Sequence, residues 1–230
     1  MSSQKDIIRK IYLIGDAVLN HKMNLRFSGF ILYGPPGNGK TEIARQSARL
    51  LAQNNSVDIY FIDGTDIATP KWGEAEEKLK NIFSVSTENK DPNRGKIIIL
   101  DDIESTMLGR SADIAKEWHF SINSVLFHSL DNQLEQPMKF LVIGTSNRID
   151  LVDKALLSRL YPIEIKSPNV EQMQEFLKLA LEENNLLLGN ESLINKVSEK
   201  IRIGEISDYR GIEHSILEEY VSQMEKELYG

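Results

Sequence analysis

The sequence predicts an α/β fold with three layers, in which a mainly parallel, five-stranded sheet is followed by a small α-helical domain. Two observations carry this prediction. Short apolar runs alternate with helical stretches up to residue 166, as in chains that wind helices around a parallel sheet. From residue 167 onward, three helical stretches follow one another with no strand candidate between them. We therefore expect an α/β domain over residues 1–166 and an α-helical domain over residues 167–230.

The strand candidates are short apolar segments bounded by polar or turn-forming residues. The runs 97–100 and 140–143 are apolar throughout, which is typical of strands buried on both faces of a parallel sheet. In chain order, the five candidates are residues 30–33, 57–62, 96–100, 140–143 and 163–165.

Helices are expected between and after these strands. An amphipathic helix is predicted from Ile7 to about Asn20, ahead of the first strand. Ser207 is the expected N-cap of the last helix, because a hydroxyl at that position can accept from the amides of the first turn. The other predicted helices occupy residues 40–53, 73–86, 117–132, 153–158, 170–184, 190–201 and 208–228.

Charge and composition exclude several classes of protein. The formal net charge is −7, and all of it lies after residue 166, because the residues before it balance. Since lysine and arginine contacts with phosphate supply most non-specific affinity for nucleic acid, this distribution argues against a nucleic-acid partner. There is no cysteine, no apolar run long enough to cross a bilayer and no secretory leader, so we expect a cytoplasmic protein with no membrane span.

A phosphate-binding motif follows the first strand candidate. Gly34-Pro35-Pro36-Gly37-Asn38-Gly39-Lys40-Thr41 matches G-x-x-x-x-G-K-[ST] and precedes a helix, which is the context that the motif needs. Its glycines let backbone amides surround a β-phosphate, and the helix N-terminus adds positive charge. Lys40 is expected to reach the β- and γ-phosphates, the Thr41 hydroxyl to bind Mg²⁺, and Glu42 to belong to the same site. The alternative is a glycine-rich turn that binds nothing.

Two carboxylates end the third strand candidate. Asp101 and Asp102 follow the run 97–100, and the carboxyl end of a buried parallel strand faces the ligand crevice in open α/β sheets. Asp101 is suited to hold Mg²⁺ through water, and Asp102 to polarise an attacking water. A role of Asp102 in capping the next turn is the alternative. The four histidines show no metal-ligand spacing, so no metal other than Mg²⁺ is expected.

Five motifs follow one another along the chain. They are the phosphate loop, then Lys71-Trp72-Gly73-Glu74-Ala75-Glu76, Asp101-Asp102-Ile103-Glu104, Val142-Ile143-Gly144-Thr145-Ser146-Asn147-Arg148 and Asp153-Lys154-Ala155-Leu156-Leu157-Ser158-Arg159. In these motifs and their order the chain resembles the AAA+ superfamily, and within it the branch that contains NSF, katanin and the valosin-containing-protein unfoldases. The resemblance covers about residues 27–215. The fold it implies, an α/β nucleotide-binding domain followed by a helical lid, agrees with the fold predicted from the residues.

The resemblance implies roles for four further residues. Asn147 matches the sensor-1 side chain, which helps to orient the attacking water, and Arg159 matches an arginine finger that completes the neighbouring subunit's site. Trp72 matches the central-pore aromatic that grips polypeptide in threading members, although a packed tryptophan is the alternative. Arg210 matches a sensor-2 arginine that reaches the γ-phosphate from the lid, and a surface role is the alternative.

One departure from the family pattern bears directly on activity. The usual Asp-Glu pair is Asp101-Asp102 here, and a side chain one methylene shorter can misplace a catalytic group enough to slow hydrolysis. The second ATPase domain of NSF is similar in this respect and serves mainly in nucleotide-dependent assembly. Glu104 could substitute for the missing glutamate, but the alternation of side chains at the strand end argues against it.

The resemblance therefore implies a homo-oligomeric ring, a hexamer in most of this family, that binds ATP with Mg²⁺ between subunits. Hydrolysis would drive the remodelling or threading of a protein substrate, delivered directly or by an adaptor. Two alternatives stay open: a slowly hydrolysing module in which ATP controls assembly, and an initiator or helicase loader that acts on nucleic acid.

Overall fold

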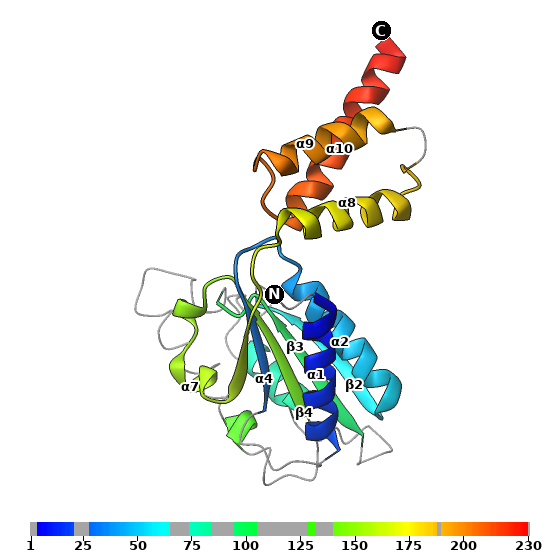
Figure 1. The fold of residues 1–230 in the computed structure, drawn as a ribbon. Coiled ribbons are helices and arrows are strands. Elements are labelled where there is room, and N and C mark those ends of the chain that lie inside the picture. The colour runs from blue at the N-terminus through cyan, green and yellow to red at the C-terminus, as the bar shows by residue number, and fades with distance from the viewer. Residues whose placement is uncertain are drawn as a thin grey trace. The chain divides into compact units, whose positions relative to one another are not determined.

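The fold is given by a computed structural model that describes residues 4–20, 28–64, 74–83, 94–104, 128–131, 140–187 and 190–229. The chain divides into two compact units (Figure 1). The first contains residues 1–34 and 40–164, and the second contains residues 35–39 and 165–230. The second unit thus includes a five-residue stretch from the early part of the chain.

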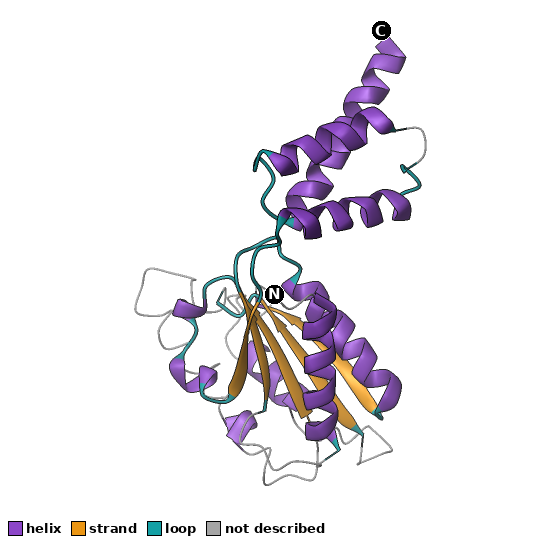
Figure 2. Ribbon diagram, viewed as in Figure 1, coloured by secondary structure: helices purple, strands orange, loops and turns teal. Residues whose placement is uncertain are grey.

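All five predicted strands form one sheet in the first unit, and every pair in it is parallel. The order is β2-β3-β4-β1-β5, and Figure 2 shows the strands of this sheet in orange. Because β1 lies between β4 and β5, the end of the first strand stands beside the end of β4. The strands are β1 (Gly29–Tyr33), β2 (Val57–Asp63), β3 (Gly95–Asp101), β4 (Phe140–Ser146) and β5 (Leu160–Glu164).

Helices cover both faces of this sheet, which confirms the three-layer prediction. On one face, α1 (Gln4–Leu19) packs against α2 (Lys40–Asn54), and both contact β4. Gly15 allows this approach, since a Cβ there would lie 2.9 Å from the Leu141 Cδ2 atom. On the other face, α4 (Glu74–Phe83) and the short α7 (Lys154–Leu157) complete a core with alternate residues of β3 and β4.

The remaining described elements of the first unit are short. A 3₁₀ turn, η2 (Ile149–Leu151), links β4 to α7. The predicted helix over residues 117–132 is described only at residues 128–131, which are helical, and the rest of it lies outside the described residues.

The second unit contains three helices with their own apolar core, formed by residues such as Leu177, Leu193 and Ile212. They are α8 (Val170–Glu183), α9 (Glu191–Arg202) and α10 (Tyr209–Tyr229). Asn169 and Gln172 form a capping box at the start of α8. Lys196 and Lys200 of α9 both pair with Glu219 of α10, at 2.7 and 3.0 Å.

The N-cap of the last helix differs from the prediction. Asp208, and not Ser207, precedes the first helical residue, and its Oδ1 accepts a hydrogen bond of 2.8 Å from the Gly211 amide. Serine and aspartate are both good N-caps, so adjacent candidates cannot be separated from sequence when the helix start is uncertain by one residue.

Candidate nucleotide-binding site

The phosphate loop joins β1 to α2, and its backbone has the shape that glycine allows. Gly37 and Gly39 have φ angles of 78° and 79°, in the left-handed region that disfavours other residues. Gly37 also leaves no room for a side chain within the second unit, since a Cβ there would lie 2.6 Å from the Asp208 Cγ atom. Gly37 is therefore needed both for backbone conformation and for space, and Gly39 for backbone conformation.

Lys40 and Thr41 begin α2, so both lie where the positive end of the helix meets the loop. The Lys40 side chain is buried, and its Nζ donates to the Gly34 carbonyl at 2.9 Å. The Thr41 Oγ1 donates to the Asp101 Oδ1 at 2.8 Å. A hydroxyl and a carboxylate in contact are oxygen ligands of the kind that Mg²⁺ takes, so this pair fits the ion that the sequence predicts.

The end of β3 is joined to the end of β4 through Thr145. The Thr145 Oγ1 donates to the Asp101 Oδ1 at 2.6 Å and accepts from the Asp102 amide at 2.9 Å. The Ile103 amide donates to the Thr145 carbonyl at 3.0 Å. These contacts turn the chain sharply after Asp101, and Asp102 has a φ of 52°. Aspartate is one of the few residues besides glycine that adopt this conformation readily.

Asn147 meets Asp102, as expected if the two residues orient one water molecule. The Asn147 Nδ2 donates to the Asp102 Oδ1 at 3.0 Å. The Asn147 backbone amide donates to the Glu104 Oε1 at 2.6 Å. Thr145 lies in one of the five sequence motifs but had no predicted role, and Glu104 was only a weak candidate. The signal for Thr145 is its register, since β3 and β4 pair as Leu100 with Gly144, one residue before Asp101 and Thr145.

Burial and neighbouring carboxylates raise the pKa of Asp102 to about 6. Burial is the largest cause, followed by the charge of Glu104, its side-chain contact with Asp102 and the charge of Asp101, while the hydrogen bond from Asn147 acts in the opposite direction. A carboxylate with a pKa near the working pH is suited to accept a proton.

This raised pKa predicts a stability change that is measurable without nucleotide. The folded state binds a proton at Asp102 more readily than the unfolded state does. The contribution of Asp102 to the free energy of unfolding therefore falls as the pH rises from about 4 to about 6. Asp102→Asn should therefore raise the melting temperature at pH 7.5 and lose this advantage at pH 4, and asparagine tolerates the left-handed backbone. Thermal melts in EDTA test this, with the exposed Glu183→Gln as control. An equal shift at both pH values would contradict it.

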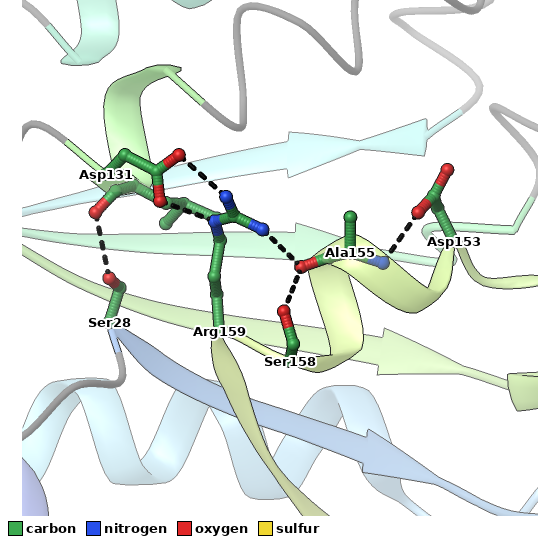
Figure 3. A network of polar contacts seen from close by, with 7 residues as sticks. Ser28, Asp131, Asp153, Ala155, Ser158 and Arg159 are labelled. Atoms are coloured by element: carbon green, nitrogen blue, oxygen red, sulfur yellow. Dashed lines mark hydrogen bonds and ion pairs between the residues drawn. The ribbon is translucent and has the colours of Figure 1, made fainter.

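Arg159 lies at the opposite edge of the sheet, where β5 begins (Figure 3). Its Nε and Nη2 each donate to the Asp131 carboxylate at 2.6 Å, and its Nη1 donates to the Ala155 carbonyl at 2.7 Å. The hydrogen bonds from Arg159 hold the pKa of Asp131 below its usual value. The Arg159 carbonyl accepts from the Ser28 amide, which immediately precedes β1.

The length of β1 separates Arg159 from the phosphate loop of its own chain. Ser28 lies beside Arg159 and Gly34 begins the loop, so the six steps between them span roughly 20 Å at about 3.3 Å per residue. An arginine side chain is far shorter than this. Arg159 therefore cannot reach Gly34, where the phosphate loop of its own chain begins.

Two further predicted site residues are exposed, and a third is not among the described residues. The Glu42 carboxylate is exposed and accepts from Gln46 Nε2 at 3.0 Å, on the outer face of α2. Arg210 is an exposed residue in the first turn of α10. Trp72 lies outside the described residues.

Comparison with known proteins identifies the family. The model of the "ATPase family associated with various cellular activities (AAA)" matches residues 30–168, well over half of the chain. The chain belongs to the AAA family. This confirms the resemblance seen in the five sequence motifs, and the family is one of ATPases that bind nucleotide.

Curated relatives of this AAA domain carry the name "AAA ATPase forming ring-shaped complexes". One from Bifidobacterium dentium is 31% identical over 156 residues, which is 65% of this chain and 29% of the relative. One from Corynebacterium jeikeium is 34% identical over 129 residues, which is 56% of this chain and 25% of the relative. The matched AAA domain thus spans less than a third of the length of these relatives.

Solved structures support the fold of the AAA domain. A crystal structure of the FIGL-1 AAA domain matches with a TM-score of 0.61 and 23% identity, covering 86% of this chain and 63% of that chain. A second FIGL-1 structure, in complex with ADP, matches with a TM-score of 0.61 and 20% identity, covering 92% of this chain and 79% of that one. In the part of the AAA domain that the structure describes, no helix is long and apolar enough to cross a membrane.

Proposed function

We propose that this AAA ATPase binds ATP with Mg²⁺ at subunit interfaces of a ring, a hexamer, and couples hydrolysis to the remodelling of a protein substrate. The observation that carries the proposal is the division of the site between two edges of one sheet. Lys40, Thr41, Asp101, Asp102 and Asn147 gather at the carboxyl edge, while Arg159 lies roughly 20 Å away at the amino edge. A ring brings these edges of adjacent subunits together.

The residues of the carboxyl edge divide the chemistry between them. The loop amides and Lys40 would hold the β- and γ-phosphates, and Thr41 and Asp101 would hold Mg²⁺. The ion, when bound, neutralises charge on the phosphate oxygens. Asn147 would orient a water molecule against Asp102, whose carboxylate would accept the proton as that water attacks. Arg159 of the adjacent subunit would stabilise charge on the transferred phosphoryl group. Trp72 would grip the polypeptide in the central pore, and Arg210 would contact the γ-phosphate.

The concentration dependence of ATP turnover tests this proposal. A site completed by a neighbour should give a specific activity that climbs steeply with protein concentration and then reaches a plateau. Added unfolded protein should raise the plateau if polypeptide is the substrate. An activity per subunit that is constant down to concentrations where the protein is monomeric would exclude a shared site.

A slowly hydrolysing assembly module is the second candidate, favoured by the aspartate at position 102. The shorter side chain places its carboxylate farther from the nucleotide, and the left-handed backbone at 102 suits aspartate better than glutamate. In this case the chain would bind ATP, assemble and turn over very slowly.

Asp102→Glu separates the two candidates. If the missing methylene limits the rate, the variant should turn ATP over about 10-fold or more faster than the parent, because placing a catalytic group 1 Å closer can change a rate by roughly 10²-fold. The strained backbone should also lower its melting temperature. Single-turnover hydrolysis at saturating protein measures the effect. No gain in a variant that still binds ATP would count against a rate limit at this side chain.

A further inference from the structure

We propose that Glu104 is a positioning residue of the hydrolytic site, which holds the backbone of Asn147 so that its side chain meets Asp102. This inference rests on the proposed function, because it concerns the same site. Three observations carry it: the burial of Glu104, the hydrogen bond that its Oε1 accepts from Asn147, and its Oε2, which has no hydrogen-bond partner among the described residues.

Glu104 is buried and forms no direct ion pair with any described residue, although its charge and that of Arg148 attract each other. Its exposed fraction is 2%, and it lies three residues beyond the end of β3. The left-handed turn at Asp102, together with the contacts of Asp102 and Ile103 with Thr145, brings the chain back beneath the end of the sheet. Side chains alternate between the two faces of the sheet only as far as this turn. Glu104 therefore lies beside Asn147, which the alternation of a straight strand would not have predicted.

The contact with Asn147 links Glu104 to the proposed catalytic pair. The Glu104 Oε1 accepts the Asn147 amide at 2.6 Å, at the first residue after β4. The Asn147 Nδ2 in turn donates to the Asp102 Oδ1 at 3.0 Å. Because the strand ladder ends at Ser146, this carboxylate is what holds the Asn147 backbone amide. Loss of the acceptor would free the backbone on which the Asn147 side chain is carried.

The second oxygen of Glu104 shows that stability alone does not explain the residue. Its Oε2 is buried and has no hydrogen-bond partner among the described residues. The charge of Glu104 also opposes the ionisation of Asp102 and helps to raise its pKa. A buried acceptor without a donor costs stability, and such violations of packing rules concentrate at functional sites. An apolar residue of the same size would fill this position without that cost.

Two substitutions of similar volume separate the acceptor from the bulk of the side chain. Glu104→Gln keeps an oxygen for the Asn147 amide, and its amide group can donate to Asp102. Glu104→Met fills the same space and removes the acceptor. Glu183→Gln and Glu183→Met make the same changes at an exposed position of α8 and serve as matched controls.

We expect Glu104→Met to lower kcat about 10- to 100-fold with little change in KM for ATP, as for a catalytic group displaced by roughly 1 Å. Amide hydrogen exchange at Asn147, measured without nucleotide, should become faster in this variant. Glu104→Gln should match the parent in both measurements and melt at the same or a higher temperature. The Glu183 variants should match the parent throughout.

Three results would overturn the inference: parent turnover in a folded Glu104→Met, an equal loss of turnover in Glu104→Gln, or a loss of ATP binding in Glu104→Met. A parent that binds ATP but shows no turnover would instead contradict the proposed hydrolytic function. In that case the exchange rate of the Asn147 amide decides the inference by itself, and an unchanged rate in Glu104→Met would refute it.

Discussion

Arg159→Ala should bind ATP as tightly as the parent and lose turnover by about 10³-fold or more, the range expected for an arginine finger. The expectation follows from its position at the amino edge of the sheet, too far from its own phosphate loop to contact a nucleotide there. Nucleotide binding and steady-state hydrolysis, measured on the same sample above the assembly concentration, give the two values.

The Arg159 substitution requires a control, because it also removes the hydrogen bonds to the Asp131 carboxylate and to the Ala155 carbonyl inside the chain. Arg94→Ala is a matched variant: Arg94 pairs with Asp58 at 2.7 Å just before β3, at the same edge of the sheet. Exposed ion pairs are worth about 0.2–1 kcal/mol, so both variants should stay folded. Only the Arg159 variant should lose turnover. A similar loss in both would identify a structural effect.

Lys40→Ala should weaken ATP binding by roughly 30- to 4,000-fold, since truncating one partner of a buried charge pair costs about 2–5 kcal/mol. Lys40 is 6% exposed and its ammonium group lies against the phosphate loop, held by the Gly34 carbonyl. Arg49→Ala, which removes a positive charge from the exposed face of the same helix, should leave binding unchanged. Titration with a fluorescent ATP analogue measures both. An equally tight Lys40 variant would disprove the phosphate site.

The two variants together test action between subunits. Arg159→Ala keeps an intact nucleotide site, and Lys40→Ala keeps an intact Arg159. Mixed rings should therefore recover turnover wherever a Lys40→Ala subunit supplies its arginine to the site of an Arg159→Ala neighbour. If each active site were formed by one chain alone, a mixture of the two inactive variants would stay inactive. Continued inactivity in proven mixed rings would exclude the shared site.

Much of the site could be predicted because it depends on local sequence. The phosphate loop needs glycine at Gly37 and Gly39 for backbone conformation, and a lysine and a threonine at the helix start, so contiguous residues reveal it. Asp101 was accessible for a related reason, because it ends a buried strand, whereas Asn147 was expected only from the resemblance to the family. Residues that end adjacent buried parallel strands must meet at one edge of the sheet.

Other parts of the site could not be predicted because they depend on contacts between distant segments. Thr145 became part of the site through its register against β3. Glu104 was judged by strand alternation, yet the turn at Asp102 ends the strand and returns Glu104 to the interior. The ion pair between Arg159 and Asp131 joins residues 28 positions apart, and no local sequence pattern predicts it.

The amino-acid sequence alone was sufficient to predict the α/β fold and its five strands, and to indicate a phosphate-binding loop, because hydrophobic periodicity and glycine conformation act over a few residues. The tertiary structure decided which polar groups meet. Hydrogen bonds at the ends of β3 and β4 depend on register and on one left-handed residue, and a shift of a single position would reverse which side chains face the site. The separation of Arg159 from the phosphate loop likewise follows only from the length and the parallel direction of β1 and β5.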